Sequence, residues 1–155
     1  MVPSSTCVLL AVLAFTTLIV AERVSFEPCS GGMKNCEVNW VEIDPCAEAA
    51  TGNPCRTKKG KVSSIKFNYA TSVPKDKMEV RVFWASATGD LPFAGLDPDA
   101  CSVTQCPVEA DHPQNLTYSL TIPKMTSSRV YNVKWDLHDD DKEVQCCFLT
   151  KIRIV

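Results

Sequence analysis

Cysteine spacing is the strongest constraint that this sequence places on its fold. Of the nine cysteines, Cys7 lies in an uncharged apolar run that ends at Ala21 and resembles a secretory signal peptide. An even number remains without Cys7, as a secreted protein favours. The remaining cysteines are Cys29 and Cys36, Cys46 and Cys55, Cys101 and Cys106, and the adjacent Cys146 and Cys147. This pattern predicts a small domain held together by disulfide bridges.

The first 21 residues decide where the protein is expected to act. The start of this segment lacks the Lys or Arg that signal peptides usually carry, so a membrane anchor is the alternative. Against an anchor, Thr16 and Thr17 interrupt the apolar run, and the charged Glu22 follows it at once. We therefore predict a signal peptide over residues 1–21 and one mature domain over residues 22–155. No later stretch approaches the roughly 20 apolar residues of a membrane span. The expected location is extracellular, with onward delivery to endosomes or lysosomes left open.

Apolar residues alternate with polar ones along most of the mature chain, as in half-buried β-strands. The segments 38–43 and 148–154 also suit strands, but their alternation shifts midway, which suggests bulges. No segment of ten residues or more has helical spacing, so we predict an all-β antiparallel sandwich. The alternating sets are Ile65, Phe67 and Tyr69; Met78, Val80, Val82 and Trp84; Tyr118, Leu120 and Ile122; and Tyr131, Val133, Trp135 and Leu137.

A run of short motifs, in order along the mature chain, carries a family resemblance. The central part is Leu91-Pro92-Phe93, then Asp97-Pro98-Asp99-Ala100-Cys101, then Cys106-Pro107. Flanking motifs are Phe26-Glu27-Pro28-Cys29, Asp44-Pro45-Cys46, Pro54-Cys55 and Val133-Lys134-Trp135-Asp136-Leu137. Together they resemble the Niemann-Pick type C2 protein family, whose ML (lipid-recognition) domain is shared with group 2 mite allergens.

The resemblance implies an immunoglobulin-like two-sheet sandwich with an internal hydrophobic lipid cavity and three disulfides. Cys147 is preferred over Cys146 because its distance from the C-terminus matches the family. Cys36 and Cys146 depart from the family pattern, and a fourth bridge between them is the economical interpretation. An intermolecular disulfide, a reactive thiol, or an exchange of roles between Cys146 and Cys147 remain open. The implied family bridges are Cys29–Cys147, Cys46–Cys55 and Cys101–Cys106.

The same resemblance places a lipid between the two sheets, where apolar contact stabilises it by about 25 cal/mol per Å² removed from water. Phe93 and Leu91 are expected at the pocket mouth, with Trp135 and Ile122 inside. The alternative for each inward residue is an ordinary place in the core. The inward strand positions add Ile65, Phe67, Tyr69, Val82, Trp84, Tyr118, Leu120, Val133 and Phe148 to the candidate lipid-binding residues.

The predicted function is a secreted carrier of a sterol or similar lipid, with a membrane or receptor as partner at the pocket mouth. Alternatives are an innate-immune accessory that captures microbial lipid, a carrier of fatty acids or semiochemicals, and a structural or inhibitory domain with a filled core. Lys124 follows Ile122 where sterol carriers place an apolar residue, so it either pairs with a carboxylate or lies on a solvated surface. The protein is expected to be a monomer, although the extra cysteine pair is compatible with a bridge within one chain or between two.

Other chemistry finds little support in the sequence. The net charge is −2, which argues against a nucleic-acid partner. The two histidines, His112 and His138, have no partner spacing typical of a catalytic or metal site, and we place His138 in a solvated hairpin turn. We expect no enzyme activity, cofactor or metal. Asn115-Leu116-Thr117 is a glycosylation sequon, which predicts a surface position for Asn115.

Overall fold

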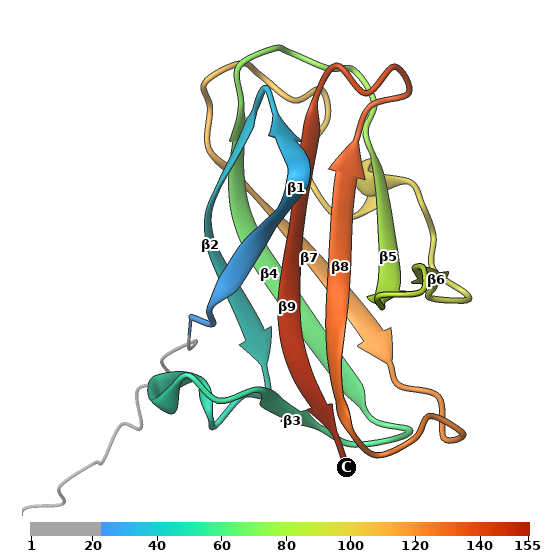
Figure 1. Ribbon diagram of the computed structural model, residues 1–155. Coiled ribbons are helices and arrows are strands. Elements are labelled where there is room, and N and C mark those ends of the chain that lie inside the picture. The colour runs from blue at the N-terminus through green and yellow to red at the C-terminus, as the bar shows by residue number, and fades with distance from the viewer. Residues whose placement is uncertain (1–22) are drawn as a thin grey trace, which may run out of the picture.

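Two antiparallel β-sheets face each other in the computed structural model, which describes residues 23–155 (Figure 1). This confirms the predicted all-β, immunoglobulin-like sandwich. Within the described part of the chain, no helix is long and apolar enough to cross a membrane. The predicted signal peptide lies outside the described residues.

The larger sheet has six strands and the smaller has three. β1 pairs with β9, β9 with β8, β8 with β5, and β5 with β6, while the short β3 runs parallel to β9. The larger sheet therefore comprises β1 (Phe26–Lys34), β3 (Cys55–Thr57), β5 (Glu79–Ala85), β6 (Leu91–Pro92), β8 (Val130–His138) and β9 (Gln145–Ile154). The smaller sheet comprises β2 (Cys36–Asp44), β4 (Val62–Thr71) and β7 (Gln114–Thr121), and 3-10 turns occur at Ala49–Thr51 and Ala100–Ser102.

The four alternating sets of the sequence form β4, β5, β7 and β8, as predicted. Along β4, for example, Ile65, Phe67 and Tyr69 are buried while the residues between them are only partly covered. The period of two thus buries one face of each sheet against the other.

Of the two predicted bulges, one is confirmed and one is wrong. The pairing of β2 with β4 shifts between Val38 and Trp40. β9, in contrast, pairs with β8 without any shift, so Phe148 and Thr150 both point inward. Leu149, which made the alternation look irregular, lines an outer hollow of the larger sheet instead. Because the pairing of β9 with β8 is uninterrupted, every second side chain of β9 faces the other sheet.

Three strands were not expected from the sequence. β1 contains Pro28 and two adjacent glycines, which usually mark the end of a strand, and its pairing with β9 shifts between Pro28 and Met33. β3 and β6 have only three and two residues. Such short strands form because their neighbours offer free backbone groups, a condition that the local sequence does not reveal.

Four disulfides form within the described residues. Adjacent residues of a strand face opposite sides, so Cys146 points into the core towards β2, while Cys147 faces β1 in its own sheet. One bridge, Cys36–Cys146, therefore joins the two sheets directly. The pairs are Cys29–Cys147, Cys36–Cys146, Cys46–Cys55 and Cys101–Cys106, which are those expected from the resemblance together with the economical fourth bridge.

Gly32 lies directly over one of these bridges. A Cβ atom at this position would lie 2.6 Å from Cβ of Cys147 and 2.7 Å from Cβ of Cys29. Atoms of a covalent bridge within a sheet cannot move aside easily, so only glycine fits here.

We predict that Gly32→Ala lowers the free energy of unfolding by about 1–3 kcal/mol, because the added methyl group overpacks the Cys29–Cys147 bridge. Urea denaturation of the oxidised protein measures the effect. Ser30→Ala, at an exposed neighbouring position, is the control and should change stability little. Equal stability of the two variants would contradict the proposed crowding.

Candidate functional site

A small apolar cavity lies between the two sheets. Its volume of about 30 Å³ holds about two water molecules and no lipid. A hollow of about 250 Å³ on the outer face of β9 and a groove of about 560 Å³ beside Cys101–Cys106 are larger, but neither separates the sheets. The inter-sheet cavity is lined by Ile43, Thr57, Ser63, Ser64, Ile65, Leu120, Ile122, Val133, Trp135, Thr150 and Ile152.

The cavity lies at one end of the sandwich. Its lining comes from the end of β2, the start of β4, the end of β7 and the start of β8, together with β3 and the later part of β9. These segments meet at the lower end in Figure 1, near the C-terminus. The register places Thr150 beside Val133, so the floor of the cavity is formed by neighbouring strands of the larger sheet.

Five of the predicted lipid-binding residues line this cavity: Ile65, Leu120, Ile122, Val133 and Trp135. They come from both sheets, from β4, β7, β8 and the residue just after β7. All five are buried. The sequence pattern therefore brings together residues that are up to 70 positions apart in the chain, since Ile65 and Trp135 face the same space.

The other buried candidates pack into the core above the cavity. The ring of Phe67 meets that of Phe148 edge-on, with 5.0 Å between centroids, and also lies near the ring of Tyr69. Val82 is buried on β5, and Tyr118 donates a hydrogen bond of 2.9 Å to the carbonyl of Asp97. These side chains fill the interior in the described structure and do not line the cavity.

The residues expected at the pocket mouth lie beside the larger sheet. The ring of Phe93 packs on that of Trp84, with centroids 5.0 Å apart, and only 8% of Phe93 is exposed. Leu91, on β6, is 68% exposed. None of the three lines the cavity. The role of Phe93 and Leu91 at the mouth and the role of Trp84 as an inward lipid-binding residue stay predictions.

Six lining residues were missed by the sequence analysis. Ile43 and Ile152 occupy inward strand positions in segments whose alternation was thought to shift. The other four, Thr57, Ser63, Ser64 and Thr150, are polar, and a search for apolar residues overlooks them. Strand parity was a usable signal for two of them, because Thr150 lies two residues after the inward Phe148 and Ser63 two residues before the inward Ile65. Ser64 has the opposite parity and Thr57 lies on the unexpected β3, so parity did not reveal them.

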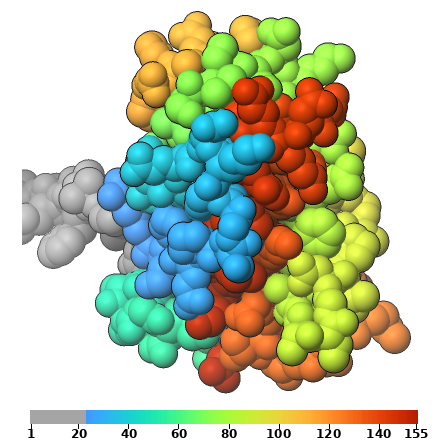
Figure 2. All heavy atoms as spheres, turned by 45° about the horizontal axis from the view of Figure 1, so that its top comes forward, coloured from blue at the N-terminus to red at the C-terminus, as the bar shows by residue number. Residues whose placement is uncertain are grey.

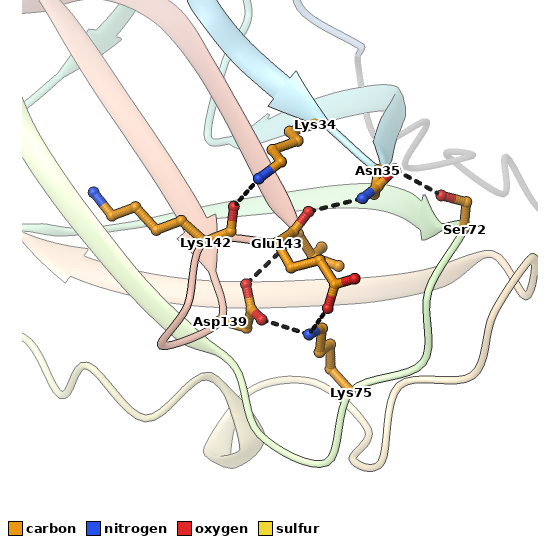
Figure 3. A network of polar contacts seen from close by, with 8 residues as sticks. Lys34, Asn35, Ser72, Lys75, Asp139, Lys142 and Glu143 are labelled. Carbon is orange, nitrogen blue, oxygen red and sulfur yellow. Dashed lines mark hydrogen bonds and ion pairs between the residues drawn. The ribbon is translucent and has the colours of Figure 1, made fainter.

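The opposite end of the sandwich is fastened by a polar network (Figure 3). The ammonium group of Lys75, after β4, lies 2.6 Å from a carboxylate oxygen of Asp139 and 2.6 Å from one of Glu143. Asn35, between β1 and β2, donates to the carbonyl of Glu143, and Lys34 donates to that of Lys142. Figure 2 shows the cyan β1–β2 turn packed against the red-orange β8–β9 turn at this end.

Charge pairing shifts the acid–base behaviour of this network. Burial raises the pKa of Asp139, but hydrogen bonds from Lys75 and from the amide of Val144 outweigh burial, so the pKa is lower than usual. Hydrogen bonds to Asp139 and Glu143 raise the pKa of Lys75. Both groups therefore stay charged in neutral and mildly acidic solution.

One sequence prediction at this end is wrong. His138 does not lie in a solvated turn: it is only 6% exposed, and its Nδ1 lies 3.3 Å from the carbonyl of Glu79 on β5. Asp136 is also buried and accepts a hydrogen bond from Gln145. The strand β8 extends to His138, so these residues are part of the sheet.

We predict that Asp139→Asn lowers the urea midpoint at pH 5–7, because it removes the carboxylate that Lys75 contacts. A lowered folded pKa gives stabilisation that is complete above the pKa of the unfolded state, about 3.9, and that is lost as the pH falls through the folded value. The difference between wild type and variant should thus shrink below about pH 4. The exposed Asp140→Asn is the matched control; a constant difference from pH 7 to pH 3 would contradict this assignment.

Side chains that could ligate a metal, and the glycosylation position, lie outside the inter-sheet cavity. Among residues 23–155, no group of three or more His, Cys, Asp or Glu side chains is placed to hold a metal ion. His112 is exposed and lies 3.6 Å from the carboxylate of Glu109. Asn115 is exposed on β7, where its side-chain oxygen accepts a hydrogen bond of 2.8 Å from Asn68. Glycosylation of Asn115 stays a prediction, now at a position on a strand.

Comparison with known proteins identifies the family of this sandwich. A family model described as the ML domain matches residues 23–154. The chain belongs to the ML domain family. This covers the whole described structure except its last residue, and it agrees with the resemblance found in the sequence.

Individual relatives and solved structures show how far the likeness extends. The chain is 29% identical over 136 residues to NPC intracellular cholesterol transporter 2 homolog a of Drosophila melanogaster, covering 84% of this chain and 88% of that protein. A Niemann-Pick type C2 protein from the Japanese carpenter ant superposes with a TM-score of 0.74 at 18% identity, over 84% of this chain and 99% of that one. Chicken MD-1 complexed with lipid IVa gives 0.51 at 12% identity, over 85% and 96%. The two structures share the fold of this ML domain.

Proposed function

We propose that this ML domain is a secreted carrier that holds one hydrophobic lipid, a sterol or a similar molecule, between its two sheets. The observation that carries the proposal is the apolar cavity between the sheets, lined by Trp135 and by aliphatic side chains from both sheets. A similar protein is named a cholesterol transporter, and another was solved with a lipid, which supports the same class of ligand. The role is binding and transport rather than catalysis.

The cavity must widen to accept a lipid. Sheet separation is opposed at the far end, where Cys36–Cys146 joins the sheets and Lys75 ties two loops together, and on the β2 side of the cavity end, where Cys46 is bridged to Cys55 of β3. On the side of β7, the described residues form no disulfide between the smaller sheet and β8. Widening therefore proceeds by movement of β7 and the following loop away from β8, with the bridged end as the fixed side. The apolar lipid surface then replaces water at about 25 cal/mol per Å².

A carrier of this kind must exchange its lipid with a partner, which we propose to be a membrane. Four large apolar side chains that face solvent lie on segments next to residues of the cavity lining: Val62 begins β4, Leu91 pairs with Trp84 of β5, Met125 follows Ile122, and Val130 begins β8. Met125 is 94% exposed in the loop that follows β7. Exposed apolar groups around one end favour contact with a lipid surface. Lys124 beside Met125 is exposed and covers Gly60, which suits the solvated alternative for this residue.

A second function within the same fold is capture of microbial lipid for a receptor. Its support is the likeness to chicken MD-1 complexed with lipid IVa. That likeness is lower in TM-score than the likeness to the carpenter ant protein, 0.51 against 0.74. We therefore retain the sterol carrier as the main proposal.

We predict that Leu120→Trp weakens binding of a fluorescent sterol by about tenfold or more, since the larger ring occupies the space into which the lipid must enter. Ser119→Trp adds the same ring one position earlier on β7, where the side chain faces solvent, and should bind normally. Fluorescence titration measures the affinity, and circular dichroism checks the fold. Equal affinity of both variants would place the lipid elsewhere.

We predict that Leu91→Asp combined with Met125→Asp slows sterol transfer to phospholipid vesicles severalfold while leaving the binding affinity unchanged, because a charged group opposes contact with the acyl region. Transfer is followed by energy transfer between a fluorescent sterol and an acceptor in the vesicle. Ser30→Asp, away from the cavity end, is the charge control. An unchanged transfer rate in the double variant would favour a receptor as the partner.

A further inference from the structure

Two hydroxyl groups face the inter-sheet cavity without any hydrogen-bond partner. Oγ1 of Thr57 and Oγ1 of Thr150 are both buried and unpaired, and both residues line the cavity. Thr57 is 3% exposed and Thr150 is 2% exposed. A buried hydroxyl without a partner costs about 1–3 kcal/mol compared with one that is paired. The lining of the apolar cavity therefore includes two threonines with unsatisfied hydroxyls, which a polar atom of a ligand could satisfy.

The two hydroxyls belong to different strands of the same sheet. Thr150 lies on β9 opposite Val133 of β8 and Phe26 of β1, in the middle of the larger sheet. Thr57 lies on β3 opposite Ile154, nearer the C-terminal end of β9. Ile152, which also lines the cavity, lies between these two levels of the sheet. A ligand that enters the widened cavity therefore meets polar groups at two depths along an apolar wall.

The other residues that line the cavity determine which kind of polar group on a ligand can be buried there. No Lys, Arg, His, Asp or Glu lines the cavity within residues 23–155. Of the two serines, Ser63 is already engaged, since its hydroxyl donates to the carbonyl of Asp44 at 3.3 Å. A carboxylate in such a site would lack a cation, and a buried unpaired charge is far more costly than a hydroxyl. A threonine hydroxyl both donates and accepts, so it suits a neutral alcohol or carbonyl.

We propose that Thr57 and Thr150 are hydrogen-bond anchors for an uncharged oxygen of the cargo, and that they select lipids with a free hydroxyl or keto group over fatty-acid anions and plain hydrocarbons. This inference rests on the proposed function, because it requires that a lipid enters between the sheets. It narrows the cargo from hydrophobic lipids in general to neutral lipid alcohols and ketones.

A third threonine provides an internal control. Thr71 on β4 is 1% exposed and its Oγ1 also has no partner, but Thr71 does not line the cavity. Replacement of any of the three by Val keeps the shape of the side chain and removes only the hydroxyl. A change in lipid selectivity that follows Thr57 and Thr150 but not Thr71 reports contact with the ligand.

The test compares two ligands that differ in a single hydroxyl, cholesterol and cholest-5-ene, with oleate as the anionic probe. Competition against a fluorescent sterol measures each affinity on the full mature, oxidised protein. We expect wild type to bind cholesterol roughly tenfold more tightly than cholest-5-ene and oleate more weakly than cholesterol. Thr57→Val, Thr150→Val, or the double variant should reduce the ratio for the sterol pair towards one, while Thr71→Val should retain the wild-type ratio.

The outcomes separate this inference from the proposed function. Equal binding of cholesterol and cholest-5-ene by wild type, or an unchanged ratio in the double variant, would overturn the anchoring role and leave the carrier function intact. Tighter binding of oleate than of cholesterol would also overturn the anchoring role and leave the carrier function intact. Failure of wild type to bind any of the three lipids would overturn both proposals. If the variants do not fold, the ratio measured on wild type still decides.

Discussion

The mutual burial of two apolar sheet faces is the interaction on which this molecule depends. The alternating strands provide one apolar face per sheet, and neither face is stable in water unless the other covers it. Phe67 from the smaller sheet and Phe148 from the larger one meet edge-on in the middle of this contact. Under the proposed function, the binding surface is part of this core, so a lipid would replace contacts that the two sheets make with each other.

Stability and function are distributed to opposite ends of the sandwich. One end holds the Cys36–Cys146 bridge and the ion pairs of Lys75, which remain charged in mildly acidic solution. The other end holds the small cavity and most of the exposed apolar side chains. The Cys46–Cys55 bridge also lies at the cavity end, where it holds the end of β2 to β3 of the larger sheet.

Strand parity explains both the successes and the omissions of the sequence-based site. Ile65, Leu120 and Val133 were correctly placed inside because apolar residues at every second position are typical of an inward face. Thr150 was missed because it is polar, although it follows the same parity on β9. Whether an inward residue lines the cavity or fills the core depends on the distance between the sheets at that residue. This distance cannot be predicted from the local sequence. Phe67 and Ile65 are alike in sequence, but only Ile65 borders the cavity.

The sequence by itself determined the fold class, the strand positions with a clear period of two, and, through its resemblance to a family, the expected bridges. Local alternation and cysteine motifs suffice for these because each depends on residues near one another in the chain or on an order of motifs. The tertiary structure decided that Cys146 points inward and Cys147 outward, that His138 is buried, and that the cavity is small and located at one end. It also decided which hydroxyls lack partners. These properties depend on the register of β9 against β1, β3 and β8 and on the contact between the sheets, where residues far apart in the sequence meet.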